Sequence, residues 1–192
     1  AFELSNLTNF IKLSEEEMTQ DSPHLRKGKR GFSGALYKTE EFLKSQPFGT
    51  VPAAYSPDGE IGIFESNSIL RSIARSSQHQ TLYGKSDFEA SRIDSYLDAN
   101  LVFAREAQVY LLEVENLTNE GYSRMVSAYE FYLSGIEASL SRNKFIVSEY
   151  LTIADISFVC DFAQFLREGH YQEIIKKKGF GLISKDLAQD FP

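Results

Sequence analysis

The sequence predicts two kinds of structure in succession, an α/β segment followed by an all-helical segment. Residues 47–75, PFGTVPAAYSPDGEIGIFESNSILRSIAR, contain a tight-turn signal between strand-like runs and then apolar residues at helical spacing. From residue 87 onward, apolar residues recur three to four positions apart over two long stretches. The polar connection between them, residues 77–85, is a natural boundary. The predicted fold class is therefore α/β plus all-α, with domains at 1–76 and 86–192.

The composition bounds the possible functions. The chain has 192 residues, 42% of them hydrophobic, which suffices for one domain of ordinary size or two small ones. A net charge of −7 without a long basic block argues against nucleic acid as the main partner. No apolar run reaches the length of a membrane span and no signal peptide is visible, so no membrane partner is expected. The single Cys160 excludes an internal disulfide and favours a reducing compartment, which predicts a cytoplasmic location.

The first forty residues give weak signals. Phe2 and Leu4 alternate, which predicts a short strand within residues 1–13. Residues 14–34 are polar and contain a basic run at 26–30, which has the composition of an exposed loop or insertion. That run could meet an anionic partner, but five residues provide neither a groove nor interleaved aromatic rings, so a solvated loop is favoured. Thr39 is suited to cap a helix that follows it.

Residues 47–75 are the most informative stretch. A short strand ending at Val51, Pro52 and Ala53 precedes a Pro-Asp-Gly turn at 57–59 and a returning strand at 61–64. Ser66 is then placed to cap a helix. The free N–H groups and the positive dipole end at such a helix start attract a carboxylate. The stretch predicts a strand, a tight turn, a strand and a capped helix whose start suits an anionic group.

The second half is predicted to be helical throughout. Residues 87–112 and 120–140 carry apolar residues along one face, and a short polar loop joins them, so an antiparallel pair of helices is expected. Their aromatic residues are expected mainly in the core. A few near the start of the first helix are available to form an apolar wall for a substrate.

A third helix is predicted after residue 152. Thr152 and Asp155 have the spacing of a capping box, so replacing either residue by Ala is expected to cost about 1 kcal/mol. The stripe expected to be buried contains Ile156, Val159, Cys160, Ala163 and Leu166. Cys160 is therefore predicted to be a core residue and not a nucleophile. The three histidines match no metal spacing, and no metal site is predicted.

Three motifs together resemble the glutathione S-transferase superfamily. They are V-P before the turn, E-S-N-x-I at 65–69 and L-T-x-A-D at 151–155, and the resemblance covers about residues 37–166. It implies a thioredoxin-like half followed by a helical half, usually as a homodimer. It also implies a cis Pro52, pairing of the Val51 backbone with the cysteinyl part of glutathione, and binding of the γ-glutamyl end by Glu65 and Ser66. Lys38 falls where some members bind the glycine carboxylate. The competing interpretation is a plain hairpin and helix, with Ser66 only a cap and Lys38 a surface residue.

The resemblance implies an enzyme that conjugates the glutathione thiol to an apolar electrophilic small molecule, with glutathione as co-substrate. The catalytic residue is not assigned. The run AFELSNL resembles the second strand of the family, which would place the first strand and helix, with the catalytic Tyr, Ser or Cys, upstream of Ala1. In the competing register, Phe2 to Leu4 form the first strand and Ser5 lies near the catalytic position.

A non-catalytic alternative rests on the same residues. PFGTVPAAYSPDG and IFESNSILRSIAR also look like the transferase-like domain of the elongation factor 1 gamma subunit, which serves chiefly as an assembly platform. A small stress or redox protein of the same fold is a third option. Fold alone does not separate these three.

Overall fold

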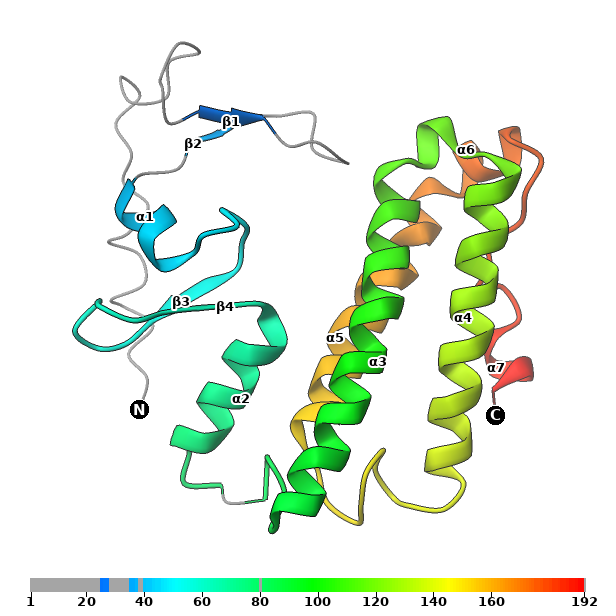
Figure 1. Cartoon of the computed structure of the whole chain (residues 1–192). Helices are drawn as coiled ribbons and strands as arrows, with labels where there is room; N and C mark the ends of the chain where they lie inside the picture. Colours follow the sequence, from blue (N-terminus) through cyan, green and yellow to red (C-terminus); the bar gives the residue numbers. More distant parts are fainter. Residues whose placement is uncertain (1–24, 28–34, 38–39, 80, 192) are drawn as a thin grey trace. The chain divides into compact units, whose positions relative to one another are not determined.

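The structure of the chain, a computed structural model, describes residues 25–27, 35–37, 40–79 and 81–191 (Figure 1). Its contacts divide the chain into two compact units, Ala1–Phe64 and Glu65–Pro192. The helix that follows the second hairpin is thus grouped by packing with the later helices. The functional division at 1–76 and 86–192 stays a prediction. No helix among the described residues is long and apolar enough to cross a membrane.

The first described elements are two short paired strands and a helix. β1 (Leu25–Lys27) pairs antiparallel with β2 (Ala35–Tyr37), and α1 (Glu40–Ser45) follows. β1 lies inside the segment 14–34, so the prediction of a loop is wrong at these three residues. Antiparallel strands can expose one face to water, and a polar composition therefore does not prevent pairing. The strand expected within residues 1–13 and the Thr39 cap lie outside the described residues.

The predicted hairpin is present, with its first strand shifted. β3 (Ala53–Tyr55) pairs antiparallel with β4 (Gly62–Phe64) in the register Ala53↔Phe64. The strand begins at Ala53 and does not end there as predicted, because Pro52 has no N–H to donate to a partner strand. In the turn, Gly59 has φ 78° and its N–H donates to the Ser56 carbonyl at 2.8 Å. The peptide bond between Val51 and Pro52 is cis, as predicted.

The second unit consists of helices. α3 and α4 run antiparallel as the predicted helix pair, and α5 packs against α3 (Figure 1). The predicted ranges 87–112 and 120–140 are confirmed to within one residue. The elements of this unit are α2 (Ser66–Ser76), α3 (Asp87–Leu112), η3 (Val114–Asn116), α4 (Asn119–Leu140), α5 (Ile153–Phe165), η4 (Leu166–Tyr171), α6 (Gln172–Lys177) and α7 (Leu187–Asp190).

An aromatic cluster forms the core between α3, α4 and α5. Phe103 stacks on Tyr132 with ring centroids 4.9 Å apart, and Phe165 meets Phe103 edge-on at 5.6 Å. Offset-stacked and edge-on pairs are the arrangements that ring quadrupoles favour. The apolar residues of α4 that are buried in this core are Met125, Tyr129, Tyr132, Leu133 and Ile136. At the start of α3, by contrast, Phe88 is exposed.

Helix α5 confirms the capping box and corrects the buried face. Thr152 and Asp155 exchange hydrogen bonds with each other's backbone N–H groups. The predicted stripe is wrong, because Val159, Cys160, Ala163 and Leu166 are exposed and Ile156 is only partly buried. The buried residues of α5 are instead Ile153, Ala154, Asp155, Ser157 and Phe165. Apolar residues occur on every side of this helix, so their spacing does not select a face, whereas the buried capping box fixes the rotation of the helix.

A buried carboxylate organises the last described segment. Glu168 is fully buried and accepts hydrogen bonds from the Ser184 N–H at 2.7 Å and the Ser184 hydroxyl at 2.6 Å. It also accepts from the Ile183 N–H at 3.2 Å and the Tyr110 hydroxyl at 3.1 Å. Burial, and then the nearby Glu168 carboxylate, raise the pKa of Tyr110. These bonds satisfy Glu168 within the fold, and its role is structural.

Candidate ligand-binding site

Two of the residues predicted to bind the ligand, Glu65 and Ser66, directly follow β4 in the chain, where α2 begins. Glu65 has φ 66° and ψ 127°, and Ser66 is the first residue of α2. The prediction that Ser66 caps the helix is therefore wrong. Glu65 occupies the cap position, and its side chain makes no capping hydrogen bond. The positive φ of Glu65 turns the chain directly from the strand into the helix, so helical geometry already begins at Ser66.

The start of α2 differs from those of the other long helices in the described part of the chain. The Ser86 hydroxyl accepts from the Glu89 N–H before α3, the Thr118 hydroxyl accepts from the Gly121 N–H before α4, and Thr152 caps α5. In α2 no side chain plays this part. Its first-turn N–H groups and the positive end of its dipole are consequently open to an external acceptor, and Ser66 is exposed.

The buried Asn67 anchors this helix start. Its amide nitrogen donates to the Leu97 carbonyl of α3 at 2.8 Å, and its amide oxygen accepts from the Ser157 hydroxyl of α5 at 3.1 Å. One turn farther along α2, Arg71 pairs with Asp94 of α3 at 2.5 Å. Asn67 thus ties the residue directly after Ser66 to two other helices, and this limits how far Glu65 and Ser66 can move.

The anchor continues into a small polar network inside the helical unit. Asn100 is buried and donates to Ser157 at 2.6 Å and to Asp161, while its own amide oxygen has no partner among the described residues. Burial raises the pKa of Asp161, and the hydrogen bonds from Asn100 and Ser157 oppose that shift. This network was not predicted from the sequence. A usable signal was Asn100 itself, an amide three residues after Leu97 and three before Phe103 on an apolar stripe.

An arginine that the sequence analysis also missed lies beside Glu65. The Arg105 guanidinium of α3 is 3.6 Å from the Glu65 carboxylate, and the two side chains are 59% and 41% exposed. The start of α2 therefore presents a carboxylate, a guanidinium and open backbone N–H groups close together. Such a combination can bind a ligand that carries both charges.

The other predicted contact, Val51, belongs to the first unit. Its side chain is 70% exposed, and β3 begins only at Ala53. No backbone hydrogen bond joins Val51 to another described residue. The loop leading to it is held by the buried Gln46, whose amide donates to the Thr50 carbonyl at 2.7 Å and accepts from the Phe48 N–H at 2.8 Å. An open backbone of this kind can pair with an extended ligand as an added strand would.

Two further residues that the sequence proposes for the site, Lys38 and Ser5, lie outside the described residues. Glu65 and Ser66 are adjacent in the second unit, whereas Val51 and Pro52 belong to the first.

Cys160 has an exposed thiol, so the prediction of a core cysteine is wrong. Among the residues that the structure describes, no group of His, Cys, Asp and Glu is arranged to hold a metal ion.

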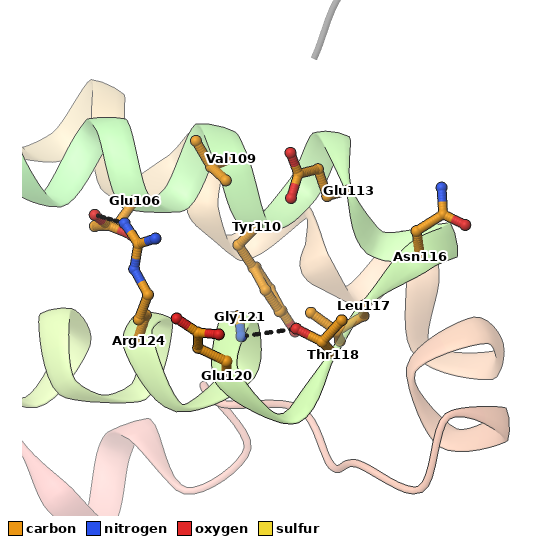
Figure 2. A pocket seen from close by; sticks show the side chains of 10 residues that line it. All are labelled: Glu106, Val109, Tyr110, Glu113, Asn116, Leu117, Thr118, Glu120, Gly121 and Arg124. Atoms are coloured by element: carbon orange, nitrogen blue, oxygen red, sulfur yellow. Dashed lines mark hydrogen bonds and ion pairs between the residues drawn. The ribbon is translucent and has the colours of Figure 1, made fainter. Parts of the chain in front are cut away.

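A separate cavity of about 230 Å³ lies between the second half of α3 and the first turns of α4 (Figure 2). Glu106, Glu113 and Glu120 line it, and the one cation among its described lining residues, Arg124, pairs with Glu106 at 2.6 Å (Figure 2). Three carboxylates and one guanidinium leave the cavity with a net negative lining. It is therefore unsuited to a ligand that is itself an anion.

Sequence and fold comparisons point to one superfamily. Elongation factor 1-gamma 1 of Oryza sativa subsp. japonica is 32% identical over 164 residues, 83% of this chain and 35% of that protein. Glutathione S-transferase F9 of Arabidopsis thaliana is 31% identical over 137 residues, 63% of this chain and 60% of the transferase. The solved structure of glutathione transferase F2 from Populus trichocarpa has a TM-score of 0.58 at 22% identity, covering 78% of this chain and 74% of that one. No family model matches the chain.

These likenesses define a glutathione-transferase-like fold, with a thioredoxin-like half followed by a helical half, and they confirm the predicted fold class. The chain belongs to the glutathione S-transferase superfamily. It spans about a third of the length of the curated elongation factors that it matches, 31% and 35% for two of them.

Proposed function

We propose that this chain binds glutathione and conjugates its thiol to an apolar electrophilic small molecule. The observation that carries the binding proposal is the start of α2, where an exposed Ser66 opens an eleven-residue helix that no described side chain caps. The α-carboxylate of the γ-glutamyl residue accepts hydrogen bonds from the free N–H groups there and is stabilised by the helix dipole. The neighbouring Glu65 carboxylate binds the γ-glutamyl ammonium.

The rest of the ligand is assigned to residues of the first unit. The backbone N–H and C=O of Val51 pair with the cysteinyl residue, and Lys38 binds the glycine carboxylate. Main-chain pairing suits this role because it holds the ligand extended and needs no particular side chain at Val51. Together the assigned residues are Val51, Pro52, Glu65, Ser66 and Lys38.

The proposed reaction is a nucleophilic substitution or addition by the thiolate. The sulfur forms a bond to an electrophilic carbon, and that carbon either expels its leaving group with the bonding electron pair or passes the pair to a group that takes up a proton. The likeness to a protein named glutathione S-transferase F9 supports this chemistry. The group that lowers the thiol pKa is left unassigned.

A second candidate function has its own support. The similarity to elongation factor 1-gamma covers 83% of this chain, more than the 63% matched by the plant transferase. In this alternative the chain is a non-catalytic interaction module, and the polar network under α2 has only a structural role. The alternative predicts a folded protein without transferase turnover.

We propose a homodimer in the cytoplasm as the working form. An apolar groove along α3 and α4 contains Tyr96, Phe131 and Gly135, and Phe131 is 81% exposed. Burying such a ring in a subunit interface would remove a large apolar surface from water. The location in a reducing compartment accords with the free, exposed Cys160.

Calorimetric titration with glutathione, run beside a transferase assay with an aryl halide, tests the function. We expect glutathione to bind and cysteinylglycine, which lacks the γ-glutamyl residue, to bind at least about tenfold more weakly, since charge-assisted bonds at the helix start are lost. Binding with turnover supports the enzyme, whereas binding without turnover supports the interaction module. Absence of glutathione binding would remove the glutathione proposal altogether.

A further inference from the structure

The ion pair between Arg105 and Glu65 has the longest separation among the ion pairs of the described residues. Its closest charged atoms, Arg105 Nη2 and Glu65 Oε2, are 3.6 Å apart, which is beyond the length of an N–H···O hydrogen bond. By contrast, Arg124 and Glu106 approach to 2.6 Å, although Arg124 is 58% exposed and Arg105 is 59% exposed. The two arginines are thus equally exposed, whereas Glu65 is more exposed than Glu106, at 41% against 26%.

The open geometry leaves both partners able to bind something else. Neither side chain makes a hydrogen bond to another described residue, so the guanidinium retains its donors and the carboxylate retains its acceptors. The backbone that carries Glu65 is held in place. Glu65 directly precedes Ser66, and Asn67 ties that helix start to α3 and α5.

We propose that Arg105 is a specificity-determining residue, which together with Glu65 selects ligands that carry a free α-amino-acid head group. The ammonium of such a ligand binds Glu65, and its carboxylate lies between the Arg105 guanidinium and the N–H groups of α2. This inference rests on the proposed binding of glutathione, whose γ-glutamyl residue has this zwitterionic head group.

The two charges account for selectivity that a helix start alone does not provide. An uncapped helix start attracts any anion of suitable size. A planar guanidinium adds a two-pronged contact that matches a carboxylate, and an adjacent carboxylate penalises ligands without a cation. The site therefore favours a zwitterion over a simple carboxylate or a simple amine.

The test is calorimetric titration of three ligands: glutathione, an analogue lacking the α-amino group and an analogue lacking the α-carboxylate. They are titrated into the full chain and into Arg105→Gln, with Arg124→Gln as the matched control. Arg105→Gln should bind glutathione and the analogue lacking the amino group on the order of tenfold more weakly, because both lose the guanidinium contact. Its affinity for the analogue lacking the carboxylate should be unchanged or slightly higher. Arg124→Gln should leave all three affinities unchanged.

The outcomes separate this inference from the proposed function. If the unaltered chain does not bind glutathione, the proposed function fails and this inference fails with it. If the unaltered chain binds glutathione and Arg105→Gln binds it equally well, the inference is overturned while the proposed function stands. A uniform loss for all three ligands would also overturn it, because Arg105 would then act only by holding Glu65. Equal unfolding midpoints of the two variants show that each loss is a binding effect.

Discussion

The helices α2 and α5 begin in opposite ways within the same unit. At α5, Thr152 and Asp155 are buried and satisfy the first backbone N–H groups with their own side chains. At α2, the exposed Ser66 follows a Glu65 of positive φ, and no side chain in the described part of the chain caps the helix. Both segments carry residues suited to capping, so composition does not distinguish them. The comparison shows that a buried helix start has to be completed by the protein, whereas an exposed one can be left for a ligand.

The largest effect is expected from removing the completed cap. Asp155 accepts from the Thr152 N–H at 2.8 Å, the Thr152 hydroxyl at 2.9 Å and the Ile146 N–H at 2.8 Å. Asp155→Ala leaves these donors unpaired in a buried place, which should lower the free energy of unfolding by about 2 to 4 kcal/mol. Denaturant titration measures the loss. Glutathione affinity of the folded fraction should not change, and a selective loss of binding at unchanged stability would give Asp155 a functional role.

The anchor beneath α2 should affect both stability and binding. Asn67→Ala removes the bonds to Leu97 and Ser157 and should cost about 1 to 3 kcal/mol. It should also weaken glutathione binding severalfold, because Glu65 and Ser66 lose their fixed position. Asn100→Ala is the matched control, since it removes bonds in the same network without touching α2. If the two variants weaken binding equally, Asn67 has no special positioning role.

The two helix starts can be compared directly by paired substitutions. Thr152→Ala should lower the free energy of unfolding by about 1 kcal/mol and leave glutathione affinity unchanged. Ser66→Ala should change stability by less than about 0.5 kcal/mol, because that hydroxyl caps nothing, and should weaken glutathione binding, because the hydroxyl is then no longer available to the γ-glutamyl carboxylate beside the open N–H groups. Denaturant titration and calorimetry of both variants measure the two quantities. If Ser66→Ala lowered the free energy of unfolding and left glutathione affinity unchanged, while Thr152→Ala weakened binding, the Ser66 hydroxyl would be a structural cap of α2.

The smallest expected effect is a pH dependence from Asp161. Burial raises the pKa of this carboxyl in the folded chain above its ordinary value of 3.8. The folded state therefore holds its proton to higher pH than the unfolded state does, and this contribution to stability falls as pH rises from about 3.8 through the raised pKa. Asp161→Asn has no titrating carboxyl at this position, so it lacks this pH-dependent contribution to stability. The stability of the native chain relative to Asp161→Asn should decline over that window, and parallel pH curves would contradict the assignment.

Local sequence patterns predicted the parts of the fold that depend on neighbours along the chain. The ranges of α3 and α4 follow from helical spacing, and the α5 cap follows from Thr152 and Asp155 standing three residues apart. The buried face of α5 could not be predicted in this way, since apolar residues surround that helix. Cys160 was therefore placed in the core although it is exposed.

The candidate site was predictable only in part, for a similar reason. Glu65 and Ser66 stand in a recognisable motif, but the cap position is one residue earlier than expected, because the positive φ of Glu65 starts the helix at Ser66. Arg105 and Asn100 lie more than thirty residues from Glu65 in the chain. Their relation to the start of α2 depends on how α2, α3 and α5 pack, and no local pattern encodes it.

The most direct test of the account compares the backbone amides at the two helix starts by NMR. Glutathione is titrated into the isotope-labelled chain while the amide signals of residues 66–68 and 153–155 are followed. We expect saturable shifts at 66–68, where the helix start is open, and unchanged signals at 153–155, where the side chains of Thr152 and Asp155 cap the helix. Unshifted amides at 66–68 under saturating glutathione would contradict the claim that the open start of α2 is the binding site.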